Sequence, residues 1–148
     1  DPGNMGALIR TAEFLGCAAV IAVGHCVDLF DPKTVRATAG AIFRIALAEG
    51  GEDDFRRWAR EVGATVVATA AEGGIPPEAL DASGPLAMLT GSEAHGLPEA
   101  ALAAADVTVT IPRRGEVESL NAVVAAGICL YNAVRQLNTR SRGDDGEE

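Results

Sequence analysis

Short apolar runs alternate along the chain with segments in which apolar residues recur every three or four positions. The runs are short enough to be buried strands of a parallel sheet, and we expect strands at 18–23, 42–47, 64–69, 86–90 and 107–111. The helical spacing predicts helices at 4–15, 31–40, 53–62, 98–104 and 119–137. Strands that alternate with helices predict an α/β domain with a mainly parallel sheet flanked by helices.

The last expected helix differs from the others because it is apolar on nearly every side between Leu120 and Tyr131. Such a helix must be covered, either by its own domain or by a partner subunit. At the other end of the chain, Asn4 is the expected N-cap of the first helix, and Gly16 is its expected stop.

Length and composition predict one domain, because 148 residues with 48% hydrophobic side chains can build a core. The longest apolar run, 122–131, is too short for a membrane span of roughly 18–20 residues. Four acids lie in the last five residues, so we expect 138–148 to be a disordered acidic tail. The net charge of −9 argues against a dedicated nucleic-acid-binding surface.

The cysteines and the start of the chain give two further expectations. Cys17, Cys26 and Cys129 lie far apart without metal-like spacing, which is typical of reduced thiols in a cytoplasmic protein. The chain begins Asp-Pro-Gly-Asn without an initiator methionine or a signal peptide. We therefore expect that a segment upstream of Asp1 is missing.

Three loops rich in glycine and proline follow expected strands, at 69–77, 91–98 and 112–119. In open α/β sheets, ligands bind at the edge where the strands have their carboxyl ends. The sequence has neither the glycine fingerprint of dinucleotide-binding domains nor a Walker A pattern. It also shows no Ser/His/Asp set and no metal-binding cluster.

The first candidate motif is Asn4-x-Gly6-x-x-x-Arg10 in the first helix. Arg10 interrupts an apolar stretch, so it needs an anion or an acidic partner. The structural alternative is an ion pair with Glu13, three residues further along the same helix.

The second candidate motif is the loop 89–97, in which Gly91 and Gly96 flank Glu93. Glycines let backbone approach a ligand closely, and Glu93 could bind a ligand amine or brace an arginine. The alternative is a glycine-rich turn with a solvated glutamate, and His95 is interpreted as a loop residue rather than a base.

The third candidate motif runs from Ile111 to Asn121, where a loop meets the start of the apolar helix. Helix starts expose backbone N–H groups that can hold a ligand. The alternative is that Ser119 is an ordinary N-cap.

In this order the motifs resemble a known family. Asn4-x-Gly6-x-x-x-Arg10, Gly91-x-Glu93-x-x-Gly96-Leu97 and Ile111-Pro112-x-x-Gly115-x-Val117-x-Ser119-Leu120-Asn121 are similar to the three motifs of the SpoU (TrmH-like) ribose 2′-O-methyltransferases. Arg36–Arg44 and Gly127–Gln136 resemble two further segments of that family. The resemblance extends from Asp1 to about Gln136, which makes 1–137 the expected catalytic domain.

The resemblance implies a deep C-terminal trefoil knot and a homodimer built on the first and last helices. It also implies binding of S-adenosylmethionine, without a metal. The implied cofactor residues are Thr69, Gly91, Ile111, Ser119 and Leu120. The chain departs from the family in lacking the usual strand before Asp1 and the N-terminal RNA-binding domain of many members.

The implied reaction is methyl transfer to a ribose 2′-OH in ribosomal or transfer RNA. Arg10 is the expected central residue, and it stays protonated, so we favour stabilisation of the developing alkoxide over base catalysis. Asn4, Ser119 and Asn121 would orient the nucleophile or Arg10, and Glu93 would brace the site. The expected RNA contacts are Arg36, Arg44, Arg113 and Arg114.

Two other functions remain open on the sequence. One is a catalytically silent knotted dimer that serves as an RNA-binding or assembly module. The other is a generic nucleotide-binding α/β domain, which the absent glycine fingerprint disfavours.

Overall fold

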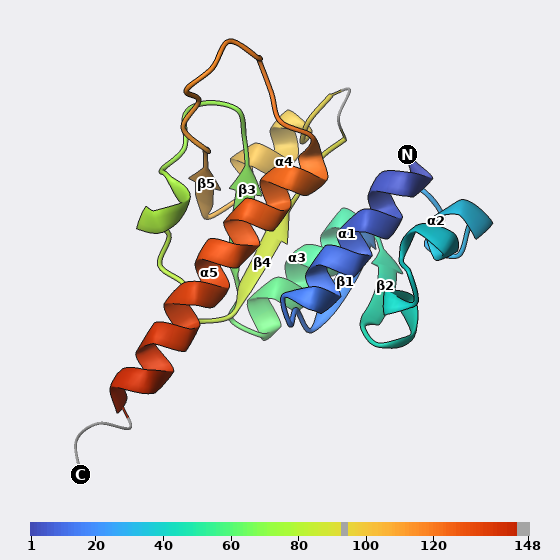
Figure 1. Cartoon of the computed structure of the whole chain (residues 1–148), viewed down its shortest axis with the longest axis horizontal. Helices are drawn as coiled ribbons and strands as arrows, with labels where there is room; N and C mark the ends of the chain where they lie inside the picture. Colours follow the sequence, from blue (N-terminus) through green and yellow to red (C-terminus); the bar gives the residue numbers. More distant parts are fainter. Residues whose placement is uncertain (93–94, 145–148) are drawn as a thin grey trace. The chain divides into compact units, whose positions relative to one another are not determined.

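The computed structural model describes residues 1–92 and 95–144, with side chains up to residue 138. The chain forms two compact units, Asp1–Val62 and Gly63–Glu148, which we call unit 1 and unit 2. Figure 1 shows the elements of both units. The helix and strand order within each unit follows the alternation that the sequence predicts.

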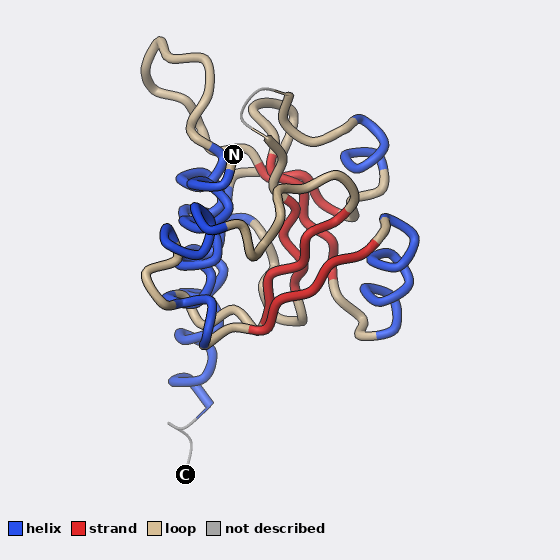
Figure 2. Tube along the Cα trace, turned by 90° about the vertical axis from the view of Figure 1, so that its right-hand side faces the viewer, coloured by secondary structure: helices blue, strands red, loops and turns tan. Residues whose placement is uncertain are grey.

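Unit 1 contains two parallel strands and three helices. Its elements are α1 (Pro2–Phe14), β1 (Ala19–Val23), α2 (Pro32–Ala37), the 3₁₀ turn η1 (Ala41–Phe43), β2 (Ala46–Gly50) and α3 (Glu52–Glu61). The strands pair in parallel, with Ala19 opposite Ala46 and Val23 opposite Gly50. Strands and helices alternate along this unit, as the α/β class requires, and Figure 2 traces strands in red and helices in blue.

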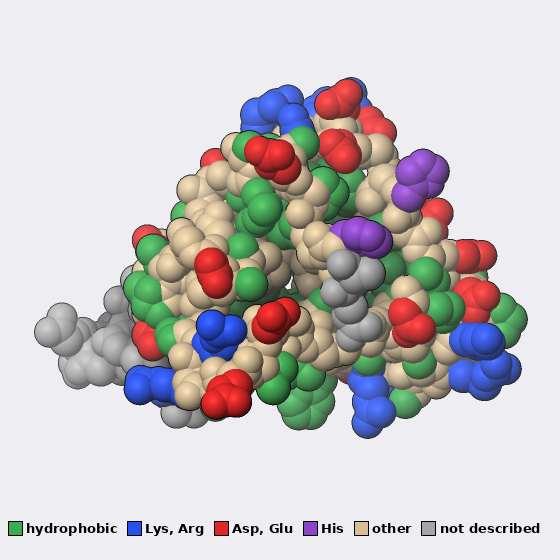
Figure 3. Space-filling view, turned by 90° about the horizontal axis from the view of Figure 1, so that it is seen from above, with side chains coloured by type: hydrophobic (Ala, Val, Ile, Leu, Met, Phe, Trp, Pro, Cys, Tyr) green, Lys and Arg blue, Asp and Glu red, His purple; other side chains and the backbone are tan. Residues whose placement is uncertain are grey.

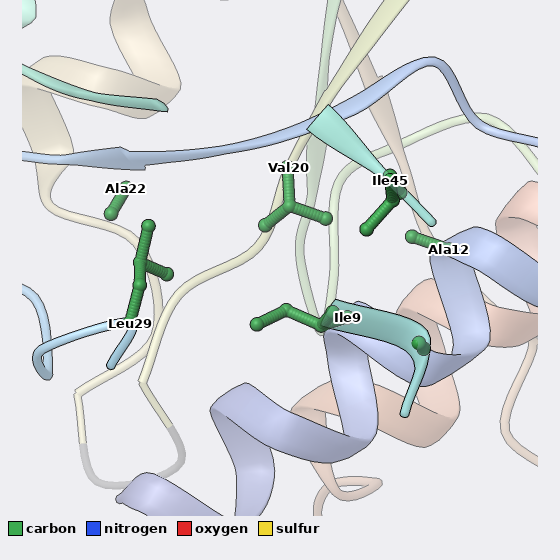
Figure 4. Packing of buried hydrophobic residues seen from close by; sticks show 7 residues of the cluster. Ile9, Ala12, Val20, Ala22, Leu29 and Ile45 are labelled. Atoms are coloured by element: carbon green, nitrogen blue, oxygen red, sulfur yellow. The ribbon is translucent and has the colours of Figure 1, made fainter. Parts of the chain in front are cut away.

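The core of unit 1 forms where α1 crosses β1. Ile9 and Ala12 come from α1, and Val20 and Ala22 from β1, and all four are buried. Figure 4 shows these side chains together with Leu29 and Ile45. The helical spacing of the first segment therefore buries the face that the sequence predicts.

Asp1, rather than Asn4, caps the first helix. Its carboxylate Oδ1 accepts a hydrogen bond of 2.9 Å from the backbone N–H of Asn4, and Pro2 occupies the first helical turn. The expected N-cap at Asn4 is wrong, because Asp1 already accepts a hydrogen bond from a free backbone N–H group at the start of the helix, and Pro2 suits the first helical position. Gly16, with a φ of +76°, follows the end of α1 as expected.

The strand expected at 42–47 begins later, at Ala46. Ala41 and Ile45 are buried, whereas Phe43 and Arg44 between them are exposed. A spacing of four residues is that of a helical turn and not of a strand. The residues before β2 accordingly form η1.

Unit 2 contains a three-stranded parallel sheet in the order β4-β3-β5. Its elements are β3 (Thr65–Thr69), the 3₁₀ turn η2 (Pro77–Ala79), β4 (Leu86–Leu89), α4 (Glu99–Ala103), β5 (Val107–Val109) and α5 (Ala122–Asp144). Val67 of the central strand, Leu80, Val109 and Cys129 of α5 form its buried core.

The last helix starts and ends later than the sequence indicates. It begins at Ala122, since Asn121 caps it, and it continues beyond Leu137 to Asp144. The helix therefore extends into the segment expected to be a disordered tail, of which residues 145–148 lie outside the described part. Of the helices that the structure describes, none has the length and hydropathy of a membrane span.

Candidate functional site

The carboxyl ends of all three strands of unit 2 meet at one edge of the sheet. The Thr69 hydroxyl at the end of β3 donates to the Leu89 carbonyl at the end of β4, with Oγ1 and O 3.1 Å apart. On the other side, the Ala70 N–H donates to the Val109 carbonyl at the end of β5 over 3.0 Å. Figure 1 shows the three arrows pointing toward the same group of loops.

The loop after β4 closes on itself in a tight turn. Ser92 and Gly96 exchange two backbone hydrogen bonds, of 3.1 Å and 2.7 Å. A Cβ on Gly91 would lie 2.0 Å from the Gly96 carbonyl carbon, and Gly96 has a φ of +65°. The turn therefore requires both glycines of the second motif, and Glu93 between them lies outside the described residues.

The loop after β5 is long and open, and it projects past the strand ends in Figures 1 and 2. Ile111 at its start is half-buried, and residues 112–120 are exposed. The loop returns to the sheet at α5, where the Thr90 hydroxyl lies 3.5 Å from the Ala122 carbonyl oxygen. It therefore starts and ends beside the edge where the other strands stop.

Asn121 is the N-cap of α5. Its side-chain oxygen accepts hydrogen bonds from the backbone N–H groups of Val123, at 2.9 Å, and Val124, at 3.2 Å. Ser119 is exposed in the loop before the cap. The interpretation of Ser119 as an ordinary N-cap is therefore wrong, and Asn121 has a structural task that its place in the motif did not reveal.

The residues expected to bind the cofactor lie along this edge of unit 2. Thr69, Gly91 and Ile111 lie at or just after the carboxyl ends of the three strands, and Ser119 and Leu120 end the loop that returns beside them. This edge combines backbone polar groups with the apolar side chains of Ile111 and Leu120, as small-molecule sites do. No group of metal-ligating side chains occurs among the described residues.

The first motif lies on α1 of unit 1. A Cβ on Gly6 would lie 2.4 Å from Ala37 Cβ and 2.6 Å from the Thr34 carbonyl oxygen, so Gly6 lets α1 touch α2. Arg10 lies one turn further on the same side of α1 and is exposed. Asn4, in the first turn, is half-buried.

Arg10 does not pair with Glu13. Within residues 1–92 and 95–138, the ion pairs are those of Arg56 with Glu52 and Arg57 with Asp54, all on α3. The structural alternative for Arg10 is therefore wrong in this structure. An exposed guanidinium outside these pairs is available to an external anion.

The arginines expected to contact RNA are all at the surface. Arg36 is exposed on α2, Arg44 follows η1, and Arg113 and Arg114 lie in the open loop after β5. Figure 3 shows basic side chains interspersed with acidic ones on the face that it views. Charge alone therefore does not mark one nucleic-acid surface on that face.

Sequence reasoning missed Gly74 in the loop after β3. Its N–H donates to the Thr110 hydroxyl over 2.9 Å, and a Cβ on it would lie 2.6 Å from the Thr108 carbonyl oxygen. Ile75 then bridges to Val109, which fixes this loop against β5. The pair Gly73-Gly74 directly before Ile-Pro was the available signal.

Comparison with known proteins identifies the family to which the chain belongs. The model of the SpoU rRNA Methylase family matches residues 1–131. The 23S rRNA (uridine(2479)-2′-O)-methyltransferase of Streptomyces viridochromogenes is 38% identical over 92% of this chain and 50% of its own length. The 23S rRNA (guanosine(2553)-2′-O)-methyltransferase RlmP of Bacillus subtilis is 34% identical over 89% of this chain and 53% of its own length.

The solved structures agree with the sequence relatives. An AdoMet-bound rRNA methyltransferase from Sinorhizobium meliloti superposes with a TM-score of 0.88 at 42% identity, covering 93% of this chain and 53% of that chain. The chain thus spans about half the length of the relatives it matches. Because the family model covers most of its residues, the chain belongs to the SpoU rRNA methylase family.

Proposed function

We propose that residues 1–137 are the catalytic domain of an S-adenosylmethionine-dependent RNA ribose 2′-O-methyltransferase. The observation that carries the proposal is the edge of unit 2, where loops leave three parallel strands side by side and Thr90, next to Gly91, meets the capped start of α5. Relatives of the same family are named as 23S rRNA 2′-O-methyltransferases. The trefoil knot that the resemblance implies stays a prediction.

We place the cofactor against Thr69, Gly91, Ile111, Ser119 and Leu120. S-adenosylmethionine supplies a methyl group on a cationic sulfonium when bound. The hydroxyl of Thr69 already donates to Leu89, so its remaining capacity toward a ligand is as an acceptor. Backbone groups around Gly91 and the apolar side chains of Ile111 and Leu120 would supply the rest of the site.

The residues of the chain must hold the ribose 2′ oxygen in line with the methyl group and stabilise the charge that develops as the hydroxyl proton passes to water. We assign that stabilisation to Arg10, which is exposed and stays protonated. Asn4, Ser119 and Asn121 would orient the ribose or Arg10, and Glu93 would brace the site. Asn121 would have this role in addition to capping α5.

The proposed substrate is ribosomal or transfer RNA in the cytoplasm, with Arg36, Arg44, Arg113 and Arg114 as phosphate contacts. All four arginines are exposed. The free thiols of Cys17, Cys26 and Cys129 fit a reducing compartment.

We also propose a homodimer that uses α5. Val124, Ile128 and Tyr131 follow one another at spacings of four and three residues, and their exposed fractions are 51%, 36% and 54%. These residues share one face of the helix, and a row of large apolar side chains in water is typical of an interface.

The test is transfer of a labelled methyl group from S-adenosylmethionine into total bacterial RNA, followed by digestion to nucleosides. We expect label in 2′-O-methylated nucleosides. Folded protein that binds the cofactor and RNA but transfers no label would favour the rival function, a catalytically silent RNA-binding dimer.

A further inference from the structure

Two phenylalanines of unit 1 are almost fully exposed. Phe43 in η1 is 86% exposed, and Phe14 at the end of α1 is 85% exposed. Single exposed apolar residues are common and need no special explanation. The two positions differ in the charges around them, and this difference is informative.

Phe43 lies in a segment that carries only positive charge. Between residues 32 and 48 the chain has Lys33, Arg36 and Arg44 and no acid, although the whole protein has a net charge of −9. All three cations are exposed. None of them belongs to an ion pair within the part of the chain that the structure describes. Phe14, in contrast, follows both an acid, Glu13, and a cation, Arg10, within one turn of α1.

The segment includes the second half of the connection between β1 and β2. Because the two strands are parallel, this connection must pass from the carboxyl end of β1 to the amino end of β2. Strands of five residues are roughly 17 Å long, which is the span of several nucleotides. Lys33 lies near the middle of this connection, in α2, and Phe43 and Arg44 lie at its end.

Buried anchors turn the cations and Phe43 outward. Thr34, Thr38 and Ala41 are buried, and the Thr34 hydroxyl donates to the Asp28 carbonyl over 3.2 Å. The Thr38 hydroxyl donates to the Val35 carbonyl over 2.7 Å. Arg36, between Thr34 and Thr38, is therefore on the solvent side, and so are Phe43 and Arg44, which lie between the buried Ala41 and Ile45.

The backbone before Phe43 is also fixed. Ala39 and Gly40 have φ values of +49° and +88°, and Ala39 is the one non-glycine residue with positive φ in the described part. A left-handed alanine is strained and persists only where its surroundings hold it. The Ala41 N–H donates to the Thr38 carbonyl over 3.0 Å directly after this bend, so Phe43 is presented by an ordered turn.

We propose that Lys33, Arg36, Phe43 and Arg44 form a strip that binds single-stranded RNA. The cations contact phosphates, and the Phe43 ring stacks on a base. The inference rests on the proposed function, in which RNA is the substrate. An exposed ring among cations, in a protein that is otherwise acidic, suits a polyanion with stacking bases.

The test is fluorescence anisotropy of the full chain with a short fluorescein-labelled oligoadenylate. Phe43→Ala should weaken binding about tenfold, because one stacked base is lost. Phe43→Tyr should bind like the wild type, whereas Phe43→Leu should be as weak as Phe43→Ala, since leucine is apolar but does not stack. The matched control is Phe14→Ala, which should leave the affinity unchanged.

The salt dependence tests the cations. Arg44→Gln should lower the slope of log affinity against log salt by about one. The matched control is Arg60→Gln on α3, an exposed cation outside the strip, which should keep the slope.

Three results would overturn the strip: full affinity in Phe43→Leu, equal losses in Phe14→Ala and Phe43→Ala, or no oligonucleotide binding by the wild type. A change of sedimentation in both Phe43→Ala and Phe43→Leu would also overturn it and would indicate a protein interface. Binding does not require methyl transfer. An inactive wild type that binds through Phe43 would therefore count against the proposed function and support the strip.

Discussion

Gly6 of α1 lies so close to Ala37 of α2 that a Cβ on Gly6 would be 2.4 Å from the Cβ of Ala37. The Thr34 carbonyl oxygen, 2.6 Å from the same position, is backbone and cannot rotate away. We expect Gly6→Ala to lower the free energy of unfolding by about 1–3 kcal/mol, because the helices must separate. Urea unfolding measures this change.

Gly3→Ala is the control for that substitution. Gly3 lies on the same helix and is exposed, and the nearest atom to its added Cβ is Asp1 Oδ1 at 3.1 Å. This oxygen caps α1 and belongs to a side chain that can shift by a few tenths of an ångström, so Gly3→Ala should destabilise the protein much less than Gly6→Ala. A Gly6→Ala protein as stable as Gly3→Ala would show that the two helices are not in contact as described.

The cap at Asn121 gives a prediction that separates stability from chemistry. Asn121→Ala should lower the free energy of unfolding by about 1 kcal/mol, whereas Asn121→Asp keeps the capping oxygen and should retain stability. If the Asn121 NH₂ group orients the substrate, Asn121→Asp should nevertheless lose methyl transfer. Full activity in a stable Asn121→Asp protein would show that Asn121 acts only as the N-cap of α5. Ser119→Ala should not change the midpoint of urea unfolding.

Hydrophobic spacing predicts the α/β class and the approximate places of the helices and strands, since burial of apolar side chains imposes its period on the sequence. It fails where two local signals compete. Asn4 and Asp1 both suit an N-cap, and only the position of Pro2 decides for Asp1. The run 41–47 is apolar apart from Arg44, so composition does not show that Ala41 and Ile45 share a face.

The sequence predicts which residues belong to the candidate site better than it predicts what each of them does. Gly6, Gly91 and Asn121 belong to the motifs, and each also has a local structural reason: close helix contact, a tight turn and a helix cap. A single sequence does not separate such reasons from binding, because both favour the same residue types. Glu93 lies outside the described residues, so its role stays a prediction.

The three thiols should differ in reactivity with a disulfide reagent at neutral pH. Burial raises the pKa of the Cys129 thiol, and that of Cys17, above the ordinary value of 9.0. Cys26 is exposed. Since the thiolate is the nucleophile, Cys26 should react first and Cys129 only on unfolding. Rapid labelling of Cys129 in a Cys17→Ala/Cys26→Ala protein would contradict its burial against Val67 and Val109.

The raised pKa of Cys129 also predicts a pH dependence of stability. The folded protein holds the thiol proton more tightly than the unfolded chain. This contribution to stability is complete below the unfolded pKa and is lost as pH rises through the folded pKa. Urea midpoints should therefore fall more steeply above pH 9.0 in the wild type than in Cys129→Ala.

The exposed face of α5 predicts a dimer that one charge can break. Wild-type protein should sediment as a dimer, and Ile128→Glu should sediment as a monomer of 15.2 kDa, because a carboxylate would be buried at the interface. Val62→Glu changes an apolar side chain of similar exposure at the end of α3, outside this face. It should remain dimeric, and a monomeric wild type at micromolar concentration would exclude the α5 dimer.

Arg10→Ala tests the chemistry most directly, because Arg10 is exposed and forms no ion pair within the described residues. Its removal should leave the melting temperature unchanged. It should lower the single-turnover rate of methyl transfer about 10²–10³-fold, as loss of a group that stabilises developing negative charge does. Arg10→Lys should also fail, since a point charge does not reproduce the planar fork of the guanidinium.

Cofactor affinity, measured by calorimetry with S-adenosylhomocysteine, should stay within a few fold in Arg10→Ala, because the proposed cofactor residues belong to unit 2. Glu13→Ala is the matched control and should remain active. A folded Arg10→Ala protein that methylates RNA at the wild-type rate would remove Arg10 from the mechanism, and equal losses in Arg10→Ala and Glu13→Ala would restore the structural pair.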